Sequence, residues 1–259
     1  MGILNVTPDS FSDGGLHFDR KVAVEAALRM HEDGAAIVDV GGEATRPGSE
    51  GVSADEELAR VVPVIEAIRT RSDVTISIDT RKARVARAAL DAGANIINDV
   101  SALRHDPEMR PLAAKRGVPV ILMHMRGEPR TMQEHPHYDD VVRDVARDLE
   151  TWRDEAVAAG VDPAQVMIDP GIGFGKTFDH NLELLAHCDR FTHIAPVVVG
   201  ASRKGFIGHL TGRPGGASRM AGSLAAVAAA HRGGAAIVRV HDVRETVDFL
   251  KVLSAVVAR

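Results

Sequence analysis

The chain has few aromatic residues, one cysteine and no long apolar run, and each shortage argues against a class of function. Its 259 residues include seven Phe, one Trp and one Tyr, too few for the stacking platforms that bind single-stranded nucleic acids. The net charge is −5 and both signs are interspersed, so no basic stripe is available for a phosphate backbone. We therefore expect no nucleic-acid partner.

The cysteine and hydropathy patterns predict a soluble cytoplasmic protein. The single cysteine, Cys188, cannot form an internal disulfide. The sequence has neither a charged and then apolar leader nor a run of about 18 apolar residues. We expect no membrane contact.

Length and strand spacing predict one domain of the α/β class, a (β/α)8 TIM barrel over residues 1–259. Such barrels typically have about 250 residues. Eight short apolar runs read as strands near residues 2–5, 36–40, 74–79, 95–98, 118–123, 166–169, 196–200 and 236–240. Between them we expect eight helices.

Three apolar stripes at helical spacing support this alternation. They are Leu58, Val61, Ile65 and Ile68; Val142, Val145, Leu149, Trp152 and Ala156; and Val243, Val247, Leu250, Leu253 and Val257. Ser53 with Glu56 forms a capping box, and the pairs at 106–107 and 162–163, each Asp-Pro, predict helix starts.

Each apolar run is followed by a polar residue suited to chemistry: Asn5, Asp39, Asp79, Asn98, His124, Asp169, Lys204 and Arg239. In this fold all strand ends face one mouth, so residues distant in sequence converge on one pocket. Three connections at that mouth, 7–19, 41–52 and 124–137, are longer than a barrel needs. Long loops on this rim are usually functional.

Four of these strand-end residues suit a flat heterocycle. Asp79, Asn98 and Asp169 can line one wall of the mouth, where carboxylates accept two donors each and the amide both donates and accepts. Lys204 adds a cationic donor. Any one of them alone would more simply be a strand-end cap or part of a structural ion pair, but four on one rim favour a ligand.

A second group suits a phosphorylated ligand. Asn5 ends the first strand, and Arg239 and His241 follow the eighth, which is its neighbour in a closed barrel. Arginine offers a bidentate fork, histidine can donate, and the asparagine oxygen can help to hold Mg²⁺. Without Asn5, His241 would more simply belong to a helix N-cap.

Two local signals near the sixth and seventh strands have simpler readings. Ser202 is compatible with a helix N-cap and also with an anion site at the helix start. Residues 170–177, PGIGFGKT, resemble a phosphate-binding loop, but Pro170 replaces the first glycine and supplies no N–H. We reject a nucleoside triphosphatase, and expect Phe174 to pack against a planar ligand or to be a hydrophobic plug.

Nearly end to end, the chain resembles the dihydropteroate synthases, the folate-pathway enzymes of the pterin-binding (β/α)8 family. The phrases that carry the resemblance are GILNVTPDSFSDGG (2–15), DVGGEATRPG (39–48), SIDT (77–80), NDVS (98–101), MHMRG (123–127), TMQ (131–133), DPGIGFGK (169–176), SRK (202–204) and RVHDV (239–243). The resemblance implies condensation of 6-hydroxymethyl-7,8-dihydropterin diphosphate with p-aminobenzoate.

The resemblance also implies residue roles. Asp79, Asn98, Asp169 and Lys204 would hold the pterin, with Met123, Phe174 and Gly200 shaping its slot. Asn5, Thr45, Arg239 and His241 would bind the diphosphate, and Asn5 would contact Mg²⁺. Arg46, Pro47, Phe174 and Ser202 would form the p-aminobenzoate site. Asp79, Lys204, Arg239 and His241 would be catalytic, whereas Asp39 and His124 receive no role. The helix of small residues expected at 223–230, together with the family, suggests a homodimer.

Three alternatives remain open at this point. A methyltetrahydrofolate:corrinoid methyltransferase would also hold a pterin with Asp and Asn, but has no need of a diphosphate site. An aldolase could use Lys204 to form a Schiff base. A pterin-binding protein without catalytic activity could keep the fold alone.

Overall fold

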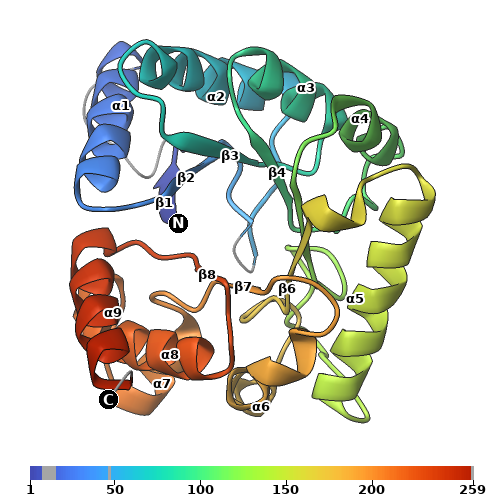
Figure 1. Ribbon diagram of the computed structural model, residues 1–259, viewed down its shortest axis with the longest axis vertical. Coiled ribbons are helices and arrows are strands. Elements are labelled where there is room, and N and C mark those ends of the chain that lie inside the picture. The colour runs from blue at the N-terminus through green and yellow to red at the C-terminus, as the bar shows by residue number, and fades with distance from the viewer. Residues whose placement is uncertain (8–15, 46–47, 258–259) are drawn as a thin grey trace.

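Eight parallel strands form a closed barrel in the computed structural model, which describes residues 1–7, 16–45 and 48–257 (Figure 1). The strands are β1 (Gly2–Asn5), β2 (Ile37–Gly41), β3 (Thr75–Asp79), β4 (Ile96–Asp99), β5 (Val120–Met123), β6 (Val166–Asp169), β7 (Val198–Val199) and β8 (Ile237–Val238). Strands β1 to β6 pair in chain order, and β7 pairs with β8. All eight predicted strands are confirmed.

Isolated bridges complete the ring. Ile168 in β6 pairs with Val197, just before β7, and Gly2 in β1 pairs with Val240, just after β8. The second junction has two hydrogen bonds of 2.9 Å, from Ile3 N to Val240 O and from Val240 N to Met1 O. The predicted TIM barrel is therefore confirmed.

The helices surround the strands: α1 (Leu16–Glu32), α2 (Ala54–Arg69), α3 (Ala83–Asp91), α4 (Met109–Arg116), α5 (Val141–Ala158), α6 (Phe178–Ala186), α7 (Gly205–Thr211), α8 (Met220–Arg232) and α9 (Val243–Val257) (Figure 1). The prediction of one helix per strand is wrong after β7, where two helices, α7 and α8, follow each other. Thr211 is followed by Gly212 in the left-handed conformation, which ends α7.

Helix starts follow the predicted capping signals only in part. Ser53 caps α2, where its hydroxyl accepts from Glu56 N at 3.2 Å. Asp106 accepts from Glu108 N at 3.0 Å, but α4 begins later, at Met109. Asp162 caps only a single 3-10 turn, Pro163–Gln165, because β6 starts immediately afterwards.

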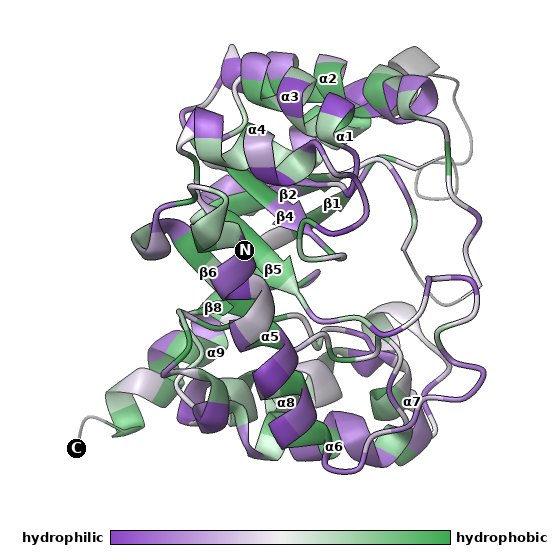
Figure 2. Cartoon of the chain, turned by 90° about the vertical axis from the view of Figure 1, so that its right-hand side faces the viewer, coloured by the Kyte–Doolittle hydropathy of each residue, from purple (hydrophilic) through white to green (hydrophobic). Residues whose placement is uncertain are grey.

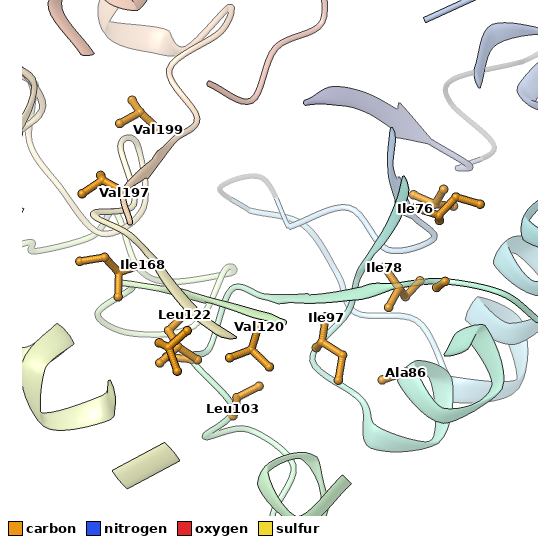
Figure 3. Close-up of a cluster of buried hydrophobic side chains, with 14 of the residues drawn as sticks. Ile76, Ile78, Ala86, Ile97, Leu103, Val120, Leu122, Ile168, Val197 and Val199 are labelled. Carbon is orange, nitrogen blue, oxygen red and sulfur yellow. The ribbon is translucent and has the colours of Figure 1, made fainter. Parts of the chain in front are cut away.

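The barrel has two apolar layers, one on each face of its strands, because successive side chains of a strand point to opposite sides. Outward residues such as Ile78, Ile97, Leu122 and Ile168 pack against the helices (Figure 3). Inward residues form a second cluster, Ile96, Ile121 and Val198 with Met1, Ile37, Met167 and Ile237. This inner layer closes the barrel interior beneath the strand ends.

Helical stripes cover the outer layer to different degrees. Val145, Leu149, Trp152 and Ala156 of α5 are buried, whereas polar residues cover much of the outer surface of the helices (Figure 2). The predicted stripe of α9 is less complete: Val243 is buried, but Val257 is 69% exposed. No helix in the described ranges is long and apolar enough to cross a membrane.

Candidate active site

A cavity of about 850 Å³ lies at the mouth of the barrel. It is lined by nine of the residues that the sequence singled out: Asn5, Thr45, Asp79, Phe174, Gly200, Ser202, Lys204, Arg239 and His241. The convergence expected from a closed parallel barrel is therefore present. Arg46 and Pro47, expected at the same mouth, lie outside the described residues.

The two-residue period of the strands explains which residues face inward. Asp39, Asn98, Met123, Asp169, Gly200 and Arg239 each stand two positions after a residue of the inner apolar layer. Asn98, Met123 and Asp169 are only 5 to 6% exposed and do not line the open cavity. Met123 instead joins an apolar cluster with Val100, Met125 and Met132, against which Phe174 packs.

Arg239 connects the two predicted ligand groups. Its Nε donates to Asp39 Oδ2 at 2.6 Å, and its Nη2 donates to Asp79 Oδ2 at 2.8 Å. Burial alone would lower the pKa of Arg239, but the carboxylates of Asp39 and Asp79 raise it, so the guanidinium is firmly charged. Arg239 was predicted to bind the diphosphate, and its hydrogen bond to Asp79 connects it also to the residues predicted to hold the pterin.

Asp39 is a buried hub that the sequence left without a role. Its side chain is fully buried, and besides Arg239 it accepts from Asn98 Nδ2 at 3.2 and 3.3 Å. The strand-end position of Asp39 was visible in the sequence. Its partners, 59 and 200 positions away, were not.

The pKa values of Asp79 and Asp169, the two carboxyl groups predicted to hold the pterin, are both shifted. Burial raises the pKa of Asp79 to about 7, although Arg239 opposes the shift. Burial also raises the pKa of Asp169, whose Oδ1 accepts from Gly171 N at 2.7 Å. Perturbed carboxyl groups at a cavity are typical of functional sites.

Gly200 lies beside this second carboxyl. A Cβ atom built on Gly200 would be 3.7 Å from Asp169 Oδ2, so a side chain there would extend over the carboxylate. Glycine therefore leaves space beside Asp169 on the β7 side.

The side chains of Lys204 and Phe174 are in contact at the barrel mouth. The ammonium of Lys204 lies 4.1 Å from the centre of the Phe174 ring, within the range of a cation–π contact. Two further side chains hold the neighbouring backbone: Asn181 Oδ1 accepts from Gly173 N at 2.6 Å, and Gln133 Nε2 donates to Gly173 O at 2.9 Å. Asn181 and Gln133 were not identified as site residues from the sequence.

Ser202 and His241, expected in different subsites, are in contact. Ser202 Oγ lies 3.0 Å from His241 Nδ1 and accepts from His241 N at 3.2 Å. Burial lowers the pKa of His241 to about 4, with help from Arg203, so its imidazole is neutral at pH 7. The reading of Ser202 as a helix N-cap is wrong, because α7 starts at Gly205 with Lys204 in the cap position.

His124 does not face the barrel interior. It follows Met123 by one position, so its side chain points the other way, and it is fully buried. Its ring stacks on Trp152 of α5 with 5.1 Å between ring centres, and its Nε2 lies 3.3 Å from Asp148 Oδ2. Burial lowers the pKa of His124 to about 3, so this imidazole is neutral.

The residues suited to a metal are few. Asn5 lines the cavity and pairs in register with Gly41 of β2. The described ranges contain no group of three His, Cys, Asp or Glu residues that could hold a metal ion. The side-chain oxygen of Asn5, together with waters and substrate phosphates, would suit Mg²⁺, which commonly combines such ligands.

Comparisons with known proteins agree with this geometry. Residues 1–241 match the family described as pterin binding enzyme. The dihydropteroate synthase of Escherichia coli K12 is 50% identical over 256 residues, which cover 98% of this chain and 90% of the relative.

Solved structures give the same answer. The dihydropteroate synthase of Xanthomonas albilineans with 4-aminobenzoic acid has a TM-score of 0.94 at 50% identity, with 100% of this chain and 93% of that chain covered. The same enzyme in complex with 7,8-dihydropteroate has a TM-score of 0.91 at 48% identity, again over 100% and 93% of the two chains.

Proposed function

We infer the reaction of this chain from its family, because it belongs to the pterin-binding enzymes and, within them, to the dihydropteroate synthases. It condenses 6-hydroxymethyl-7,8-dihydropterin diphosphate with p-aminobenzoate, giving 7,8-dihydropteroate and diphosphate. It is therefore a transferase of folate biosynthesis.

One observation carries the assignment of roles at the cavity: Arg239 binds the carboxylates of both Asp39 and Asp79. The guanidinium would thus lie between the pterin and its diphosphate. We propose that Asp79, Asn98, Asp169 and Lys204 hold the pterin, with Met123, Phe174 and Gly200 shaping the slot. Acceptors on one side and a cation on the other fit the alternating N–H and C=O groups of the pterin edge.

The mechanism that we propose follows from where charge develops. When the bond between the exocyclic methylene and the diphosphate oxygen breaks, its electron pair leaves with diphosphate and positive charge spreads into the dihydropterin ring. The carboxylates of Asp79 and Asp169 stabilise that cation. The neutral aniline nitrogen of p-aminobenzoate then attacks the methylene, and the resulting ammonium group loses its proton to solvent or to the released diphosphate.

The leaving group needs positive charge and hydrogen-bond donors. Arg239 offers its guanidinium, while Thr45 and His241, both at the cavity, offer a hydroxyl and a neutral imidazole. Asn5 would hold Mg²⁺ together with the diphosphate, and the cation would supply charge neutralisation there. Asp79, Lys204, Arg239 and His241 are therefore the groups that we propose as catalytic.

The p-aminobenzoate site would lie beside Phe174 and Ser202. The Xanthomonas albilineans structure with 4-aminobenzoic acid supports a site for this substrate in the family. Ser202 lines the cavity but is only 5% exposed. The carboxylate of p-aminobenzoate would therefore have to touch this side chain directly to bind its hydroxyl. Arg46 and Pro47 remain predictions, since the structure does not describe them.

We also propose a homodimer that forms through α9. The predicted small-residue stretch, 223–230 in α8, turns Ser223, Ala226, Val227 and Ala230 into its own barrel. On α9, by contrast, Val252, Val256 and Val257 are 65 to 69% exposed. We expect sedimentation to give the mass of a dimer for the wild type and of a monomer for Val252→Glu. A monomer mass for both proteins would refute the proposal. A cytoplasmic location stays a prediction.

Release of diphosphate tests the reaction against the other readings. We expect release with the pterin diphosphate in the presence of Mg²⁺, and dihydropteroate only when p-aminobenzoate is added. A requirement for a corrinoid would instead favour the methyltransferase, and borohydride trapping of Lys204 with a carbonyl substrate would favour the aldolase. Ligand binding without turnover would favour the non-catalytic protein.

A further inference from the structure

Lys176 is a buried cation that the proposed reaction does not use. It is 2% exposed, and it belongs to the glycine-rich stretch that resembles a phosphate-binding loop. Its Nζ donates to Phe174 O at 3.0 Å and to His124 O at 3.3 Å, and lies 3.0 Å from His124 Nδ1. In the part of the chain that the structure describes, no carboxylate forms an ion pair with it.

The protonation state of His124 determines which atom donates in the contact between its Nδ1 and Lys176 Nζ. A neutral imidazole has one N–H, and Asp148 can only accept, because hydrogen bonds from His124, Arg126 and Arg147 outweigh burial and lower the pKa of Asp148. The proton of His124 therefore lies on Nε2, facing Asp148, and Nδ1 accepts from Lys176. Three acceptors then match the three N–H groups of a charged Lys176.

The glycines of this loop allow it to approach the chain after β5. At Gly171, with φ of +69°, an added Cβ would lie 1.9 Å from His124 O. At Gly175, with φ of +60°, it would lie 2.5 Å from Arg126 O. The next residues complete the pattern, since Lys176 bonds His124 and Thr177 caps α6 by accepting from His180 N at 3.2 Å.

A charged amine is a costly way to join two loops. Burial lowers the pKa of Lys176 to about 7, with Asp169 opposing the shift and Lys204 and Arg126 adding to it. An apolar side chain of similar length, such as methionine, would occupy the volume without desolvating a charge. A lysine here indicates a use for its charge or its donors.

We propose that Lys176 is a positioning residue for the pterin, because its hydrogen bonds to Phe174 O and to His124 fix the backbone of Phe174 against the end of β5. The proposal rests on the proposed function. Through the carbonyl of Phe174, Lys176 sets the ring that lies under Lys204. Through its charge, it favours the ionised form of Asp169, as Lys204 and Arg239 also do.

Four variants separate these contributions. Lys176→Met removes donors and charge, Lys176→Gln keeps donors without charge, and Lys176→Arg keeps both. Lys115→Met is the matched control, because Lys115 is exposed on α4, away from both the cavity and α9. Each is measured for melting temperature, for KM of both substrates, and for binding of 6-hydroxymethyl-7,8-dihydropterin between pH 5 and 9.

We expect Lys176→Met to weaken pterin binding about tenfold or more, as the loss of a charged hydrogen-bond donor does, while the KM for p-aminobenzoate changes less. The acid side of the binding profile should move to higher pH, since the pKa of Asp169 rises when a nearby cation is lost. Besides each other, Asp169 and Lys176 are influenced by the charges of Lys204, Arg239, Arg126 and Asp148. Lys176→Arg should restore the profile more fully than Lys176→Gln.

The proposal fails if Lys176→Met matches Lys115→Met in pterin affinity and pH profile. It also fails if all three Lys176 variants lose thermal stability and raise both KM values equally, which is what a purely structural lysine would give. If Lys176→Met does not fold, Lys176→Gln is judged by the same criteria. An inactive wild type that still binds the pterin would reject the proposed function, and the pterin-binding and melting measurements would still test the role of Lys176.

Discussion

Arg239 donates a hydrogen bond of 2.8 Å to Asp79 although the two residues are 160 positions apart in the sequence. The contact joins the end of β8 to the end of β3, two strands that are not neighbours in the barrel. It joins the carboxylate proposed for the pterin to the cation proposed for the diphosphate. In the proposed site, one connected set of charges would therefore contact both the pterin and the diphosphate.

Asp79→Asn tests the carboxylate at the centre of this set. We expect kcat/KM for the pterin diphosphate to fall roughly 10² to 10³-fold, as when one preorganised electrostatic partner is removed. Asp154→Asn is the control, because Asp154 lies on α5 with a side chain that is 67% exposed. Equal losses in both variants would show that the cavity carboxylate has no special role.

Pterin binding should depend on pH through Asp79. Burial raises the pKa of its carboxyl to about 7, so the group is largely protonated at pH 6 and ionised at pH 8. The ionised form accepts more hydrogen bonds, so affinity for 6-hydroxymethyl-7,8-dihydropterin should rise with pH through about 7. This ligand is suitable because it carries no titrating phosphate. In Asp79→Asn the Asp79 component of the rise should disappear, and an unchanged profile would contradict the assignment.

Asp39→Asn should impair both halves of the pterin diphosphate site. The carboxylate orients Asn98 on one side and Arg239 on the other, although Asp39 itself is fully buried. We expect about ten- to a hundredfold weaker binding of both the pterin and inorganic diphosphate, since hydrogen bonds to a charged group contribute roughly 1.5 to 3 kcal/mol. Titration calorimetry with each ligand checks this. Loss of only one affinity would show that Asp39 serves one subsite.

Gly171→Ala should destabilise the loop after β6. The new methyl group would lie 1.9 Å from the carbonyl oxygen of His124, in a residue whose φ of +69° already disfavours a side chain. We expect a loss of about 2 kcal/mol or more in the free energy of unfolding. Gly205→Ala is the comparison for stability, because an added Cβ there meets nothing within 4 Å. Similar urea midpoints for the two variants would contradict the close approach.

The sequence predicted the barrel well because strand and helix periods are local signals. The eight strand ends, and with them Asp79, Asn98, Asp169 and Arg239, followed from that periodicity. The family resemblance, in turn, supplied the reaction. The start of α4 at Met109 was less predictable, and so was the fact that Asp162 caps only a 3-10 turn, since an Asp-Pro pair caps a turn as readily as a helix.

Contacts between distant segments were beyond the sequence. Asp39 ended a strand like its neighbours, but its role depends on Arg239, 200 positions later. His124 ended a strand too, yet the strand period turns it toward α5. Lys176 appeared in the false phosphate-loop pattern and in the family phrase at 169–176, but neither gave it a role. Its significance comes from acceptors brought to it by the folding of two loops.

Product formation by the purified chain tests the central claim most directly. With 6-hydroxymethyl-7,8-dihydropterin diphosphate, p-aminobenzoate and Mg²⁺, we predict 7,8-dihydropteroate and diphosphate in equal amounts, at a rate that Asp79→Asn largely abolishes. Absence of dihydropteroate with the wild type, or an undiminished rate with Asp79→Asn, would contradict the account.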